Sequence, residues 1–337
     1  MRNRHKPALI LILLIALSIA LAFSSFFTRQ QQEKETPKIE TVKIMEDGHS
    51  LLYLPQYIAL RKGFFDEEKL QVEIITATTR GTMLNALADR RSEILLTGLE
   101  YAIYARAEGK GNLIAFAALA KKDGALLVSR EKDQAFQWDS LKYKTIITGP
   151  PSERKTVLLK KTLIKYGLAP NHQVTLFTNI PASLQKGAFQ SGTGDYILLD
   201  EPDASRLEAS TPGKIVVFLG QETGELPAAV YLANSDYIKN HPEIVERLTG
   251  AIHKALLWLN QHNTGEIVRA IRPYYKNIDA SLLNKAVDCY RLQNTWTTNT
   301  AIEPAEYDCL LELLIEAREI SEPIPYKKMV DKRFAPI

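Results

Sequence analysis

Residues 53–65 of the chain read YLPQYIALRKGFF, and this stretch decides the fold. Pro55 suits the first turn of a helix, because its missing N–H would have no partner there, and Gly63 can adopt the left-handed conformation that ends a helix. Four positions recur at steps of three and four residues and give this helix one largely apolar face: Leu54, Tyr57, Ile58 and Arg61. The stretch therefore predicts a short helix between Pro55 and Gly63.

A predicted strand lies on each side of this helix. Residues 42–45 precede it, and the residues that follow it, 70–74, alternate apolar and polar side chains as in a half-buried strand. In an open α/β sheet a ligand usually sits beyond the carboxyl ends of the strands, near helix N-termini that offer unpaired N–H groups. The loop 46–50 is therefore the first place where we expect a ligand, although the helix signals alone also fit an ordinary surface helix.

The composition is that of a folded protein with more than one core. A chain of 337 residues exceeds the usual size of one hydrophobic core, which favours two lobes. Hydrophobic residues make up 45% and charged residues 24%, as in an ordinary folded chain. The net charge is +3, and without Arg2, Arg4 and Lys6 the basic and acidic residues are equal in number. This balance argues against a nucleic-acid partner.

The N-terminal segment has the order of an export signal. Three basic residues come before an almost wholly apolar run, 8–22. Residues 20–22 are a possible cleavage site, but Phe23, Phe26 and Phe27 extend the run to about the 20 residues that a membrane-spanning helix needs. We therefore expect residues 1–28 to be a signal peptide or a membrane anchor, residues 29–38 to be a polar linker, and the rest of the chain to lie outside the cytoplasm.

Strands and helices keep alternating along the rest of the chain, which predicts an α/β fold. Two breaks in this pattern, near 121–125 and 219–228, indicate that the chain leaves one lobe and later returns to it. The predicted limits are 39–121 with 228–337 for lobe 1 and 122–227 for lobe 2. The two crossing segments then form a two-segment hinge.

The sequence also predicts local features of the later helices. Ser152 and Ser235 are each predicted to cap the helix that follows them. Helices near 264–271, 279–292 and 303–318 are expected to form an outer layer. Cys289 and Cys309, the only cysteines, can pair in an oxidising compartment, or they are two buried thiols on adjacent helices.

Several of these segments together resemble a known family. LPQYIA at 54–59, KGFF at 62–65 and LQVE at 70–73 are similar to the opening of the nitrate/sulfonate/taurine and thiamine-precursor group of ABC-transporter substrate-binding proteins. Later segments extend the resemblance over nearly all of 39–334. The resemblance implies a two-lobe type II periplasmic-binding-protein fold that closes on a small solute. It also implies delivery to an ABC permease with its ATPase.

The candidate ligand-binding residues lie in or near loops that follow predicted strands: His49, Ser50, Tyr53, Thr79, Arg80, Glu100, Tyr101, Ser152, Arg154, Glu201 and Leu226. Tyr53 and Leu226 are expected to form an apolar wall. In the resembled family a strand that ends in Glu-Pro stands at the cleft, and Glu201 and Pro202 match that motif. Arg80, Arg106 and Arg154 are mostly expected to be solvated surface residues, but Arg80 or Arg154 can pair with an anionic ligand. Each polar candidate also has an ordinary interpretation as a cap, an ion-pair partner or a core residue.

The ligand class stays open between two chemistries. A sulfonate or nitrate calls for hydroxyl groups, backbone N–H groups and an arginine, whereas a pyrimidine ring calls for tyrosine stacking and a carboxylate. Glu100, Tyr101 and Glu201 slightly favour a nitrogen-containing ring.

Other functions fit the sequence less well. The HExxH, GxSxG and Walker patterns are absent, so the sequence lacks the main signatures of metalloproteases, α/β-hydrolases and nucleotide hydrolases. A pyrimidine-synthase-like enzyme of the same family would need a cysteine-rich iron-binding stretch that this chain lacks. The alternative to transport is a membrane-anchored receptor that presents its bound ligand to a sensor. We expect no cofactor, no metal and no enzymatic activity.

Overall fold

A computed structural model of the chain describes residues 38–77, 79–131 and 135–335. The chain divides into two compact units, Met1–Glu40 and Thr41–Ile337, and all but the first residue of the strands and helices lies in the second unit. The predicted signal peptide or anchor and all but one residue of the predicted linker lie outside the described residues. Within the described part of the chain, no helix is both long enough and apolar enough to cross a membrane.

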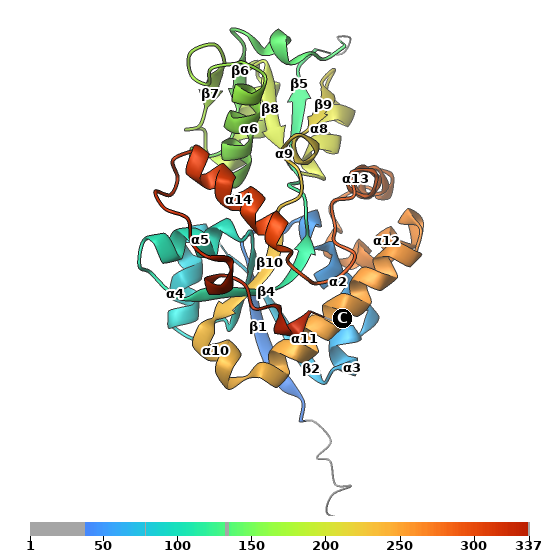
Figure 1. Ribbon diagram of the computed structural model, residues 1–337. Helices are drawn as coiled ribbons and strands as arrows, with labels where there is room; N and C mark the ends of the chain where they lie inside the picture. Colours follow the sequence, from blue (N-terminus) through green and yellow to red (C-terminus); the bar gives the residue numbers. More distant parts are fainter. Residues whose placement is uncertain (1–37, 78, 132–134, 336–337) are drawn as a thin grey trace, which may run out of the picture. The chain divides into compact units, whose positions relative to one another are not determined.

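The first sheet has the strand order β2-β1-β3-β10-β4 (Figure 1). Its strands are β1 (Glu40–Glu46), β2 (Leu70–Thr76), β3 (Ile94–Thr97), β4 (Leu113–Ala120) and β10 (Ala229–Asn234). β1 and β3 are parallel, with Ile44 opposite Ile94, whereas β10 runs antiparallel to both β3 and β4. The carboxyl ends of β1 and β3 therefore meet at one edge of this sheet.

The second sheet has the order β7-β6-β8-β5-β9. Its strands are β5 (Leu126–Ser129), β6 (Thr145–Ile147), β7 (Thr175–Phe177), β8 (Tyr196–Leu199) and β9 (Lys214–Phe218). β6 is parallel to β7 and β8, and β5 is antiparallel to β8 and β9. β10 in the first sheet and β5 in the second thus run antiparallel to both of their neighbours, and each is the first strand after a crossing between the sheets.

The chain passes between the two sheets twice, as the sequence predicts. It leaves the first sheet after β4 and enters β5, and it returns from β9 through α9 (Leu219–Thr223) to β10. The two crossing segments are hydrogen-bonded to each other: Leu226 N donates to Lys121 O at 2.8 Å, and Leu219 N donates to Ala125 O at 2.9 Å. The predicted α/β fold with two sheets and two crossing segments is confirmed; the exact lobe limits stay a prediction.

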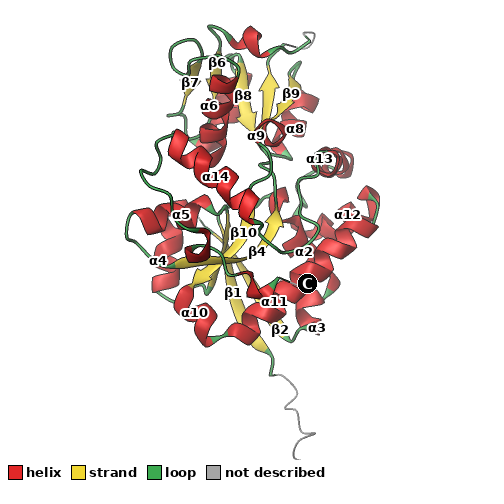
Figure 2. Cartoon of the chain, viewed as in Figure 1, coloured by secondary structure: helices red, strands yellow, loops and turns green. Residues whose placement is uncertain are grey.

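Helices accompany both sheets (Figure 2). Their bounds are α2 (Leu54–Lys62), α3 (Phe64–Glu67), α4 (Met83–Ala88), α5 (Glu100–Ala107), α6 (Arg154–Lys165), α7 (Ala182–Gln190), α8 (Asp203–Ser210), α10 (Ser235–Asn240), α11 (Pro242–Gln261), α12 (Thr264–Ile271), α13 (Ala280–Leu292) and α14 (Pro304–Glu316). Short 3-10 turns add η1 (Leu51–Tyr53), η2 (Arg80–Thr82), η3 (Trp138–Leu141), η4 (Arg272–Tyr274), η5 (Tyr326–Lys328) and η6 (Lys332–Phe334).

Helix α2 forms as its sequence predicts. Pro55 lies in its first turn, and Gly63 follows its last residue with φ of 75°, a left-handed conformation that glycine adopts without strain. Tyr57 and Ile58 are almost fully buried, and α2 packs against α11 and α12. The helix is therefore a core element, not the ordinary surface helix that its signals alone also allow.

The helices α13 and α14 pack against helices from different parts of the chain. α13 packs against α12 and also against α8, and α14 packs against α6. Tyr290 of α13 shows how this contact is held, because its hydroxyl donates to Gly124 O and accepts from Glu201 N, both at 3.0 Å. These helices therefore do more than form the outer layer that the sequence predicts.

Two predicted helix caps are wrong. Glu153, not Ser152, is the N-cap of α6, because the helix begins only at Arg154, three residues after Pro151. At α10 the Asn234 side chain accepts from Asp236 N at 3.0 Å, so Ser235 is already inside the helix. In both places the serine is one residue away from the position that its side chain was predicted to fill.

The two cysteines are unpaired, and each is half-buried rather than fully buried. They lie on α13 and α14, and Cys309 Sγ donates to Thr223 O at 3.5 Å. Burial, and after it the neighbouring Glu201 carboxylate, raises the pKa of Cys289 to about 12. Cys289 is therefore a protonated, weakly nucleophilic thiol near neutral pH.

Candidate functional site

A cluster of polar side chains lies where β1 and β3 end. Asp47 follows β1, Thr97 is the last residue of β3, and Tyr53 closes the 3-10 turn before α2. The Asp47 carboxylate accepts from Thr97 Oγ1 at 2.5 Å and from the Tyr53 hydroxyl. Because an ionised carboxylate makes strong hydrogen bonds, these contacts fix the loop after β1 against the end of β3.

Arg154, from the helix that follows β6 of the second sheet, binds residues near this edge. It is the first residue of α6, and its Nη1 donates to both oxygens of Glu100, the first residue of α5, at 3.0 and 3.1 Å. Its Nε donates to Asp123 Oδ2, in the first crossing segment, at 2.7 Å. The arginine therefore links three parts of the chain: its own helix α6, helix α5, and the first crossing segment.

This ion-pair network is almost fully buried. The exposed fractions of the Arg154, Glu100 and Asp123 side chains are 12%, 0% and 3%. Burial opposes the charge on Arg154, but the carboxylates of Glu100 and Asp123 outweigh burial and hold the pKa of the guanidinium well above its usual value. The expectation that Arg154 is a solvated surface residue is therefore wrong, because two carboxylates, 54 and 31 residues away along the chain, converge on it.

Gly98, between Thr97 and Glu100, leaves room for this network. A Cβ at this position would lie 1.8 Å from Arg154 Nη1 and 2.0 Å from Glu100 Oε2. Any larger residue must therefore displace the arginine or the glutamate from the buried pair. The backbone of Gly98 needs no left-handed conformation, so the requirement for glycine is one of space alone.

We expect Gly98→Ala to lower the free energy of unfolding by about 1–3 kcal/mol, because the new methyl group overpacks a buried site. Chemical denaturation measures this change. Gly48→Ala is the matched control: a Cβ there meets nothing within 4 Å, so its effect should stay below about 0.5 kcal/mol. Equal effects of the two substitutions would contradict the close packing around Gly98.

A second polar cluster lies next to the first, around Glu46 at the end of β1. The Glu46 side chain is 1% exposed. It accepts from Tyr57 Oη at 2.6 Å, Thr76 Oγ1 at 2.9 Å and Gln56 Nε2 at 3.1 Å. Gln56 in turn accepts from the hydroxyl of Tyr231 on β10 at 2.9 Å. Glu46 thus fastens α2 to the ends of β1 and β2.

His49, the first sequence-predicted candidate, belongs to this second cluster. Its Nδ1 lies 2.8 Å from Tyr57 Oη and 3.4 Å from Glu46 Oε1, and its Nε2 lies 3.0 Å from Tyr274 O. Because a carbonyl oxygen only accepts, Nε2 carries a hydrogen. The ring also packs between Tyr57 and Tyr275, with centroids 4.8 and 4.6 Å away, and 38% of the side chain remains exposed.

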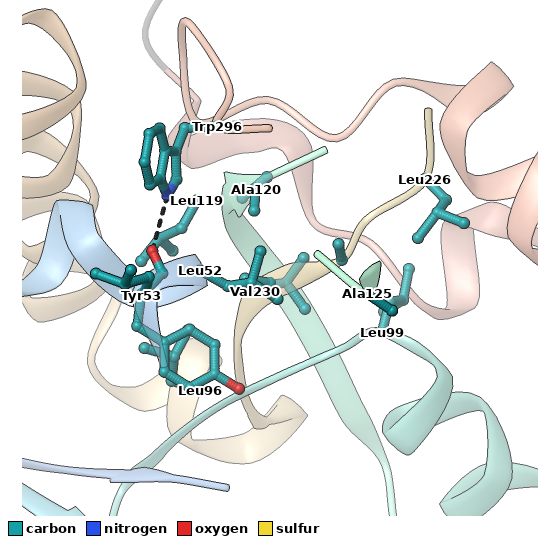
Figure 3. Close-up of a cluster of buried hydrophobic side chains, with 14 of the residues drawn as sticks. Leu52, Tyr53, Leu96, Leu99, Leu119, Ala120, Ala125, Leu226, Val230 and Trp296 are labelled. Carbon is teal, nitrogen blue, oxygen red and sulfur yellow. Dashed lines mark hydrogen bonds between the residues drawn. The ribbon is translucent and has the colours of Figure 1, made fainter. Parts of the chain in front are cut away.

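The two predicted wall residues, Tyr53 and Leu226, belong to a buried apolar cluster next to the polar edge, which is the edge of the first sheet where β1 and β3 end (Figure 3). The exposed fractions of Tyr53 and Leu226 are 4% and 0%. Figure 3 shows Leu226 next to Ala125 and Leu99, and Trp296 donates its indole N–H to Leu51 O at 3.0 Å. Both crossing segments and the loop before α2 are therefore anchored in one apolar core.

The remaining candidates have different surroundings. Ser50 Oγ accepts from Leu52 N at 3.1 Å and caps η1, while Thr79 is exposed and its carbonyl accepts from Thr82 Oγ1 at 2.7 Å. Tyr101 Oη accepts from Leu84 N at 3.2 Å. Ser152 is exposed, and its carbonyl accepts from Tyr104 Oη at 3.5 Å. The side chain of Arg80 lies outside what the structure describes, although its backbone begins η2.

Glu201 lies at the end of β8 but is engaged within its own segment. Its carboxylate is 2% exposed and accepts from Ser205 Oγ at 2.7 Å and Ser205 N at 3.1 Å. Burial raises the pKa of this carboxyl above its usual value. The bond from Glu201 to Pro202 is cis. The Glu-Pro motif therefore shapes the start of α8, and its role toward a ligand stays a prediction.

Sequence reasoning missed three residues: Asp47 and Thr97 of the first polar cluster, and Asp123 of the ion-pair network. Asp47 lies in the loop that the sequence marked as the first place for a ligand, and Asp123 lies in a predicted crossing segment. Their positions next to strand ends were visible signals. What the sequence does not show is that Asp123 and Glu100 meet one arginine.

The described residues offer no other obvious centre for chemistry. Among them, no group of three or more His, Cys, Asp or Glu side chains is placed to hold a metal ion. Two surface hollows, of about 690 and 490 Å³, are lined by none of the predicted ligand residues.

Comparison with known proteins shows the family of this chain. A family model described as NMT1/THI5 like matches residues 52–265, more than half of the sequence. The chain belongs to the NMT1/THI5-like family. A relative in Bacillus subtilis (strain 168), named putative binding protein YtlA, is 33% identical over 303 residues, which cover 90% of this chain and 91% of the relative.

Solved structures share the fold of this NMT1/THI5-like chain. The alkanesulfonate-binding protein SsuA of Xanthomonas axonopodis pv. citri, bound to MOPS, has a TM-score of 0.69 and 14% identity, covering 88% of this chain and 100% of that one. The periplasmic aliphatic sulphonate-binding protein SsuA of Escherichia coli has a TM-score of 0.68 and 16% identity, covering 87% and 97%. The chain therefore has the periplasmic-binding-protein fold that the sequence predicts.

Proposed function

We propose that this protein is the extracytoplasmic substrate-binding component of an ABC importer. It captures a small polar solute between two lobes and delivers the solute to a membrane permease, which works with an ATPase. The observation that carries this proposal is the polar edge of the first sheet, which is linked to the second sheet by Arg154. Support comes from the NMT1/THI5-like family, the relative named as a binding protein, and structural neighbours that bind sulfonates.

The proposed mechanism is binding without bond making. The two crossing segments connect the sheets, so a small change in their backbone angles opens or closes the space between the polar edge and α6. A ligand that makes contacts with both sides shifts the population toward the closed form, by as much as it binds that form more tightly. The permease then recognises the closed form. The protein acts as a carrier, and we propose no enzymatic activity for it.

The proposed solute is an aliphatic sulfonate, nitrate, taurine or a pyrimidine-type thiamine precursor. Glu100, Tyr101 and Glu201 are the basis for the slight preference for a nitrogen-containing ring. In the structure the carboxylate of Glu100 binds Arg154, and that of Glu201 binds Ser205. We therefore give up this preference and propose that hydroxyl and backbone N–H groups at the polar edge make most of the contacts with the ligand.

The proposed site keeps the candidates that the sequence selected: His49, Ser50, Tyr53, Thr79, Arg80, Glu100, Tyr101, Ser152, Arg154, Glu201 and Leu226. To these we add Asp47, Thr97 and Asp123. Arg154 is proposed to act as a positioning residue, because both of its carboxylate partners are buried protein side chains. We also propose that the folded body lies in the periplasm or at the outer face of the cytoplasmic membrane, held there by the N-terminal segment if that segment is not cleaved.

Native mass spectrometry of the protein purified from its own cells tests the proposal. We expect a discrete mass excess of one small molecule, which disappears when the protein is denatured and whose accurate mass names the solute class. Asp47→Ala should retain less of this molecule, and the exposed-residue variant Glu73→Ala should retain as much as the wild type. Equal retention by both variants would place the ligand elsewhere on the protein.

A further inference from the structure

The larger surface hollow, of about 690 Å³, lies at the opposite edge of the first sheet from the polar cluster. Its floor is apolar and includes Ile114 at the start of β4, Ile238 of α10, and Val330. Val330 is held there because Ala115 N donates to Met329 O and Asp331 N donates to Ala115 O, both at 2.8 Å. The last described segment of the chain thus forms a fixed wall along β4.

The rim of this hollow is strongly basic. Lys239, Lys327, Lys332 and Arg333 line it and are all exposed, whereas Asp331 is the only carboxylate that lines it. Asp331 is already paired, because both of its oxygens accept from the Arg333 guanidinium, at 2.9 and 2.6 Å. Because Asp331 offsets the charge of Arg333, the three lysines around the apolar floor remain, and they repel one another unless a further anion lies between them. The combination fits an occupant that is both anionic and amphipathic.

The path of the chain favours a membrane as that occupant. Leu113, the first residue of β4, pairs with Asn234, the last residue of β10. Because β1 and β4 both run antiparallel to β10, β1 also begins at this edge of the sheet. The strand with which the described elements begin, β1, therefore starts at the edge that carries the hollow. If residues 8–27 stay in a membrane, the 12 residues that follow them can reach at most about 40 Å, so the basic rim remains near the lipid surface.

We propose that this basic hollow, defined by Ile114, Ile238, Lys239, Lys327, Lys332 and Arg333, docks on an anionic phospholipid surface. The cations bind headgroup phosphates, and the apolar floor receives the upper part of an acyl chain or a glycerol backbone. Each basic residue near such a surface adds to the attraction, and the attraction falls off within a Debye length. Docking would hold the first sheet against the membrane and leave the opposite, polar edge free for a solute. It does not depend on which solute is bound.

Hydrogen–deuterium exchange of the full-length protein, read by mass spectrometry, tests the proposal. We expect amides of residues 326–335 to exchange more slowly with vesicles that contain phosphatidylglycerol than with vesicles of phosphatidylcholine alone. The protection should disappear when salt rises from about 0.1 to about 1 M, where the Debye length falls from about 10 to about 3 Å. Because exchange is read segment by segment, insertion of the N-terminal run into the vesicles does not imitate this result.

Two variants sharpen the test. Lys327→Gln with Lys332→Gln should raise the lipid concentration that gives half-maximal protection by about tenfold or more. Lys214→Gln with Lys276→Gln removes the same charge from two exposed lysines outside the hollow and should leave that concentration unchanged. Equal exchange in both kinds of vesicle would overturn the proposal. Protection by inorganic phosphate alone, or by polyglutamate but not by vesicles, would also overturn it, because the occupant would then be a free anion or an acidic protein.

Discussion

Arg154→Met should lower the free energy of unfolding by about 3 kcal/mol, because removing one partner of a buried ion pair takes away a charge that the others need. Here the loss falls on two carboxylates at once, Glu100 and Asp123, whose side chains are 0% and 3% exposed. Both carboxylates would then stay buried without the guanidinium that binds them. Denaturation by urea, followed by circular dichroism, measures the change.

The control for this prediction is an ion pair on the surface. Lys144 and Asp195 lie 3.6 Å apart with about two-fifths of each side chain exposed, so Lys144→Met should lower stability by less than about 1 kcal/mol. Adding Glu100→Gln to Arg154→Met should recover part of the loss, because one of the two buried carboxylates that bound the arginine is then replaced by a neutral amide. An Arg154→Met variant as stable as the Lys144→Met variant would show that the buried network does not hold the two sheets.

Glu46→Ala should lower the free energy of unfolding by about 3 kcal/mol, because two buried donors and a third, more exposed one lose their acceptor. The donors are Tyr57 Oη, Gln56 Nε2 and Thr76 Oγ1, at 2.6, 3.1 and 2.9 Å. Burial, then Tyr275 and Glu46, raise the pKa of Tyr57, so its hydroxyl remains a donor at any pH in common use. The same denaturation experiment measures this loss.

Glu46→Gln separates the geometry of this cluster from its charge. The amide keeps one acceptor oxygen in nearly the same place, so we expect a smaller loss, of about 1–2 kcal/mol. Glu73→Ala, at an exposed position of β2, should change stability by less than about 0.5 kcal/mol. If Glu46→Ala behaved like Glu73→Ala, the attachment of α2 to the ends of β1 and β2 would have to come from apolar packing alone.

Local signals were enough to predict many of the elements. Pro55 and Gly63 bracket α2 in the structure as they do in the sequence, and α12 has the predicted bounds, 264–271. The two crossings were also visible, because at each one the alternation of strands and helices breaks. The short polar helix α8, with the sequence DASRLEAS, was missed because too few apolar residues recur in it to mark a helical face.

The candidate site was harder to predict, because it depends on contacts between distant residues. The sequence places Glu100, Asp123 and Arg154 near strand ends, but nothing in their spacing shows that one guanidinium binds both carboxylates. The space left by Gly98 becomes meaningful only when those partners are known. The error at Ser152 has a local cause, since the two prolines before it delay the start of α6 until Arg154.

The central claim is that this chain binds one small polar solute, and titration calorimetry tests it most directly. The full-length protein is titrated with aliphatic sulfonates, taurine, nitrate and pyrimidine precursors of thiamine. Our account predicts saturable binding of one solute class, with one molecule per chain, and weaker binding of the same solute to Asp47→Ala. Absence of binding for every compound in this panel, by a protein that is folded and free of copurified ligand, would contradict the account.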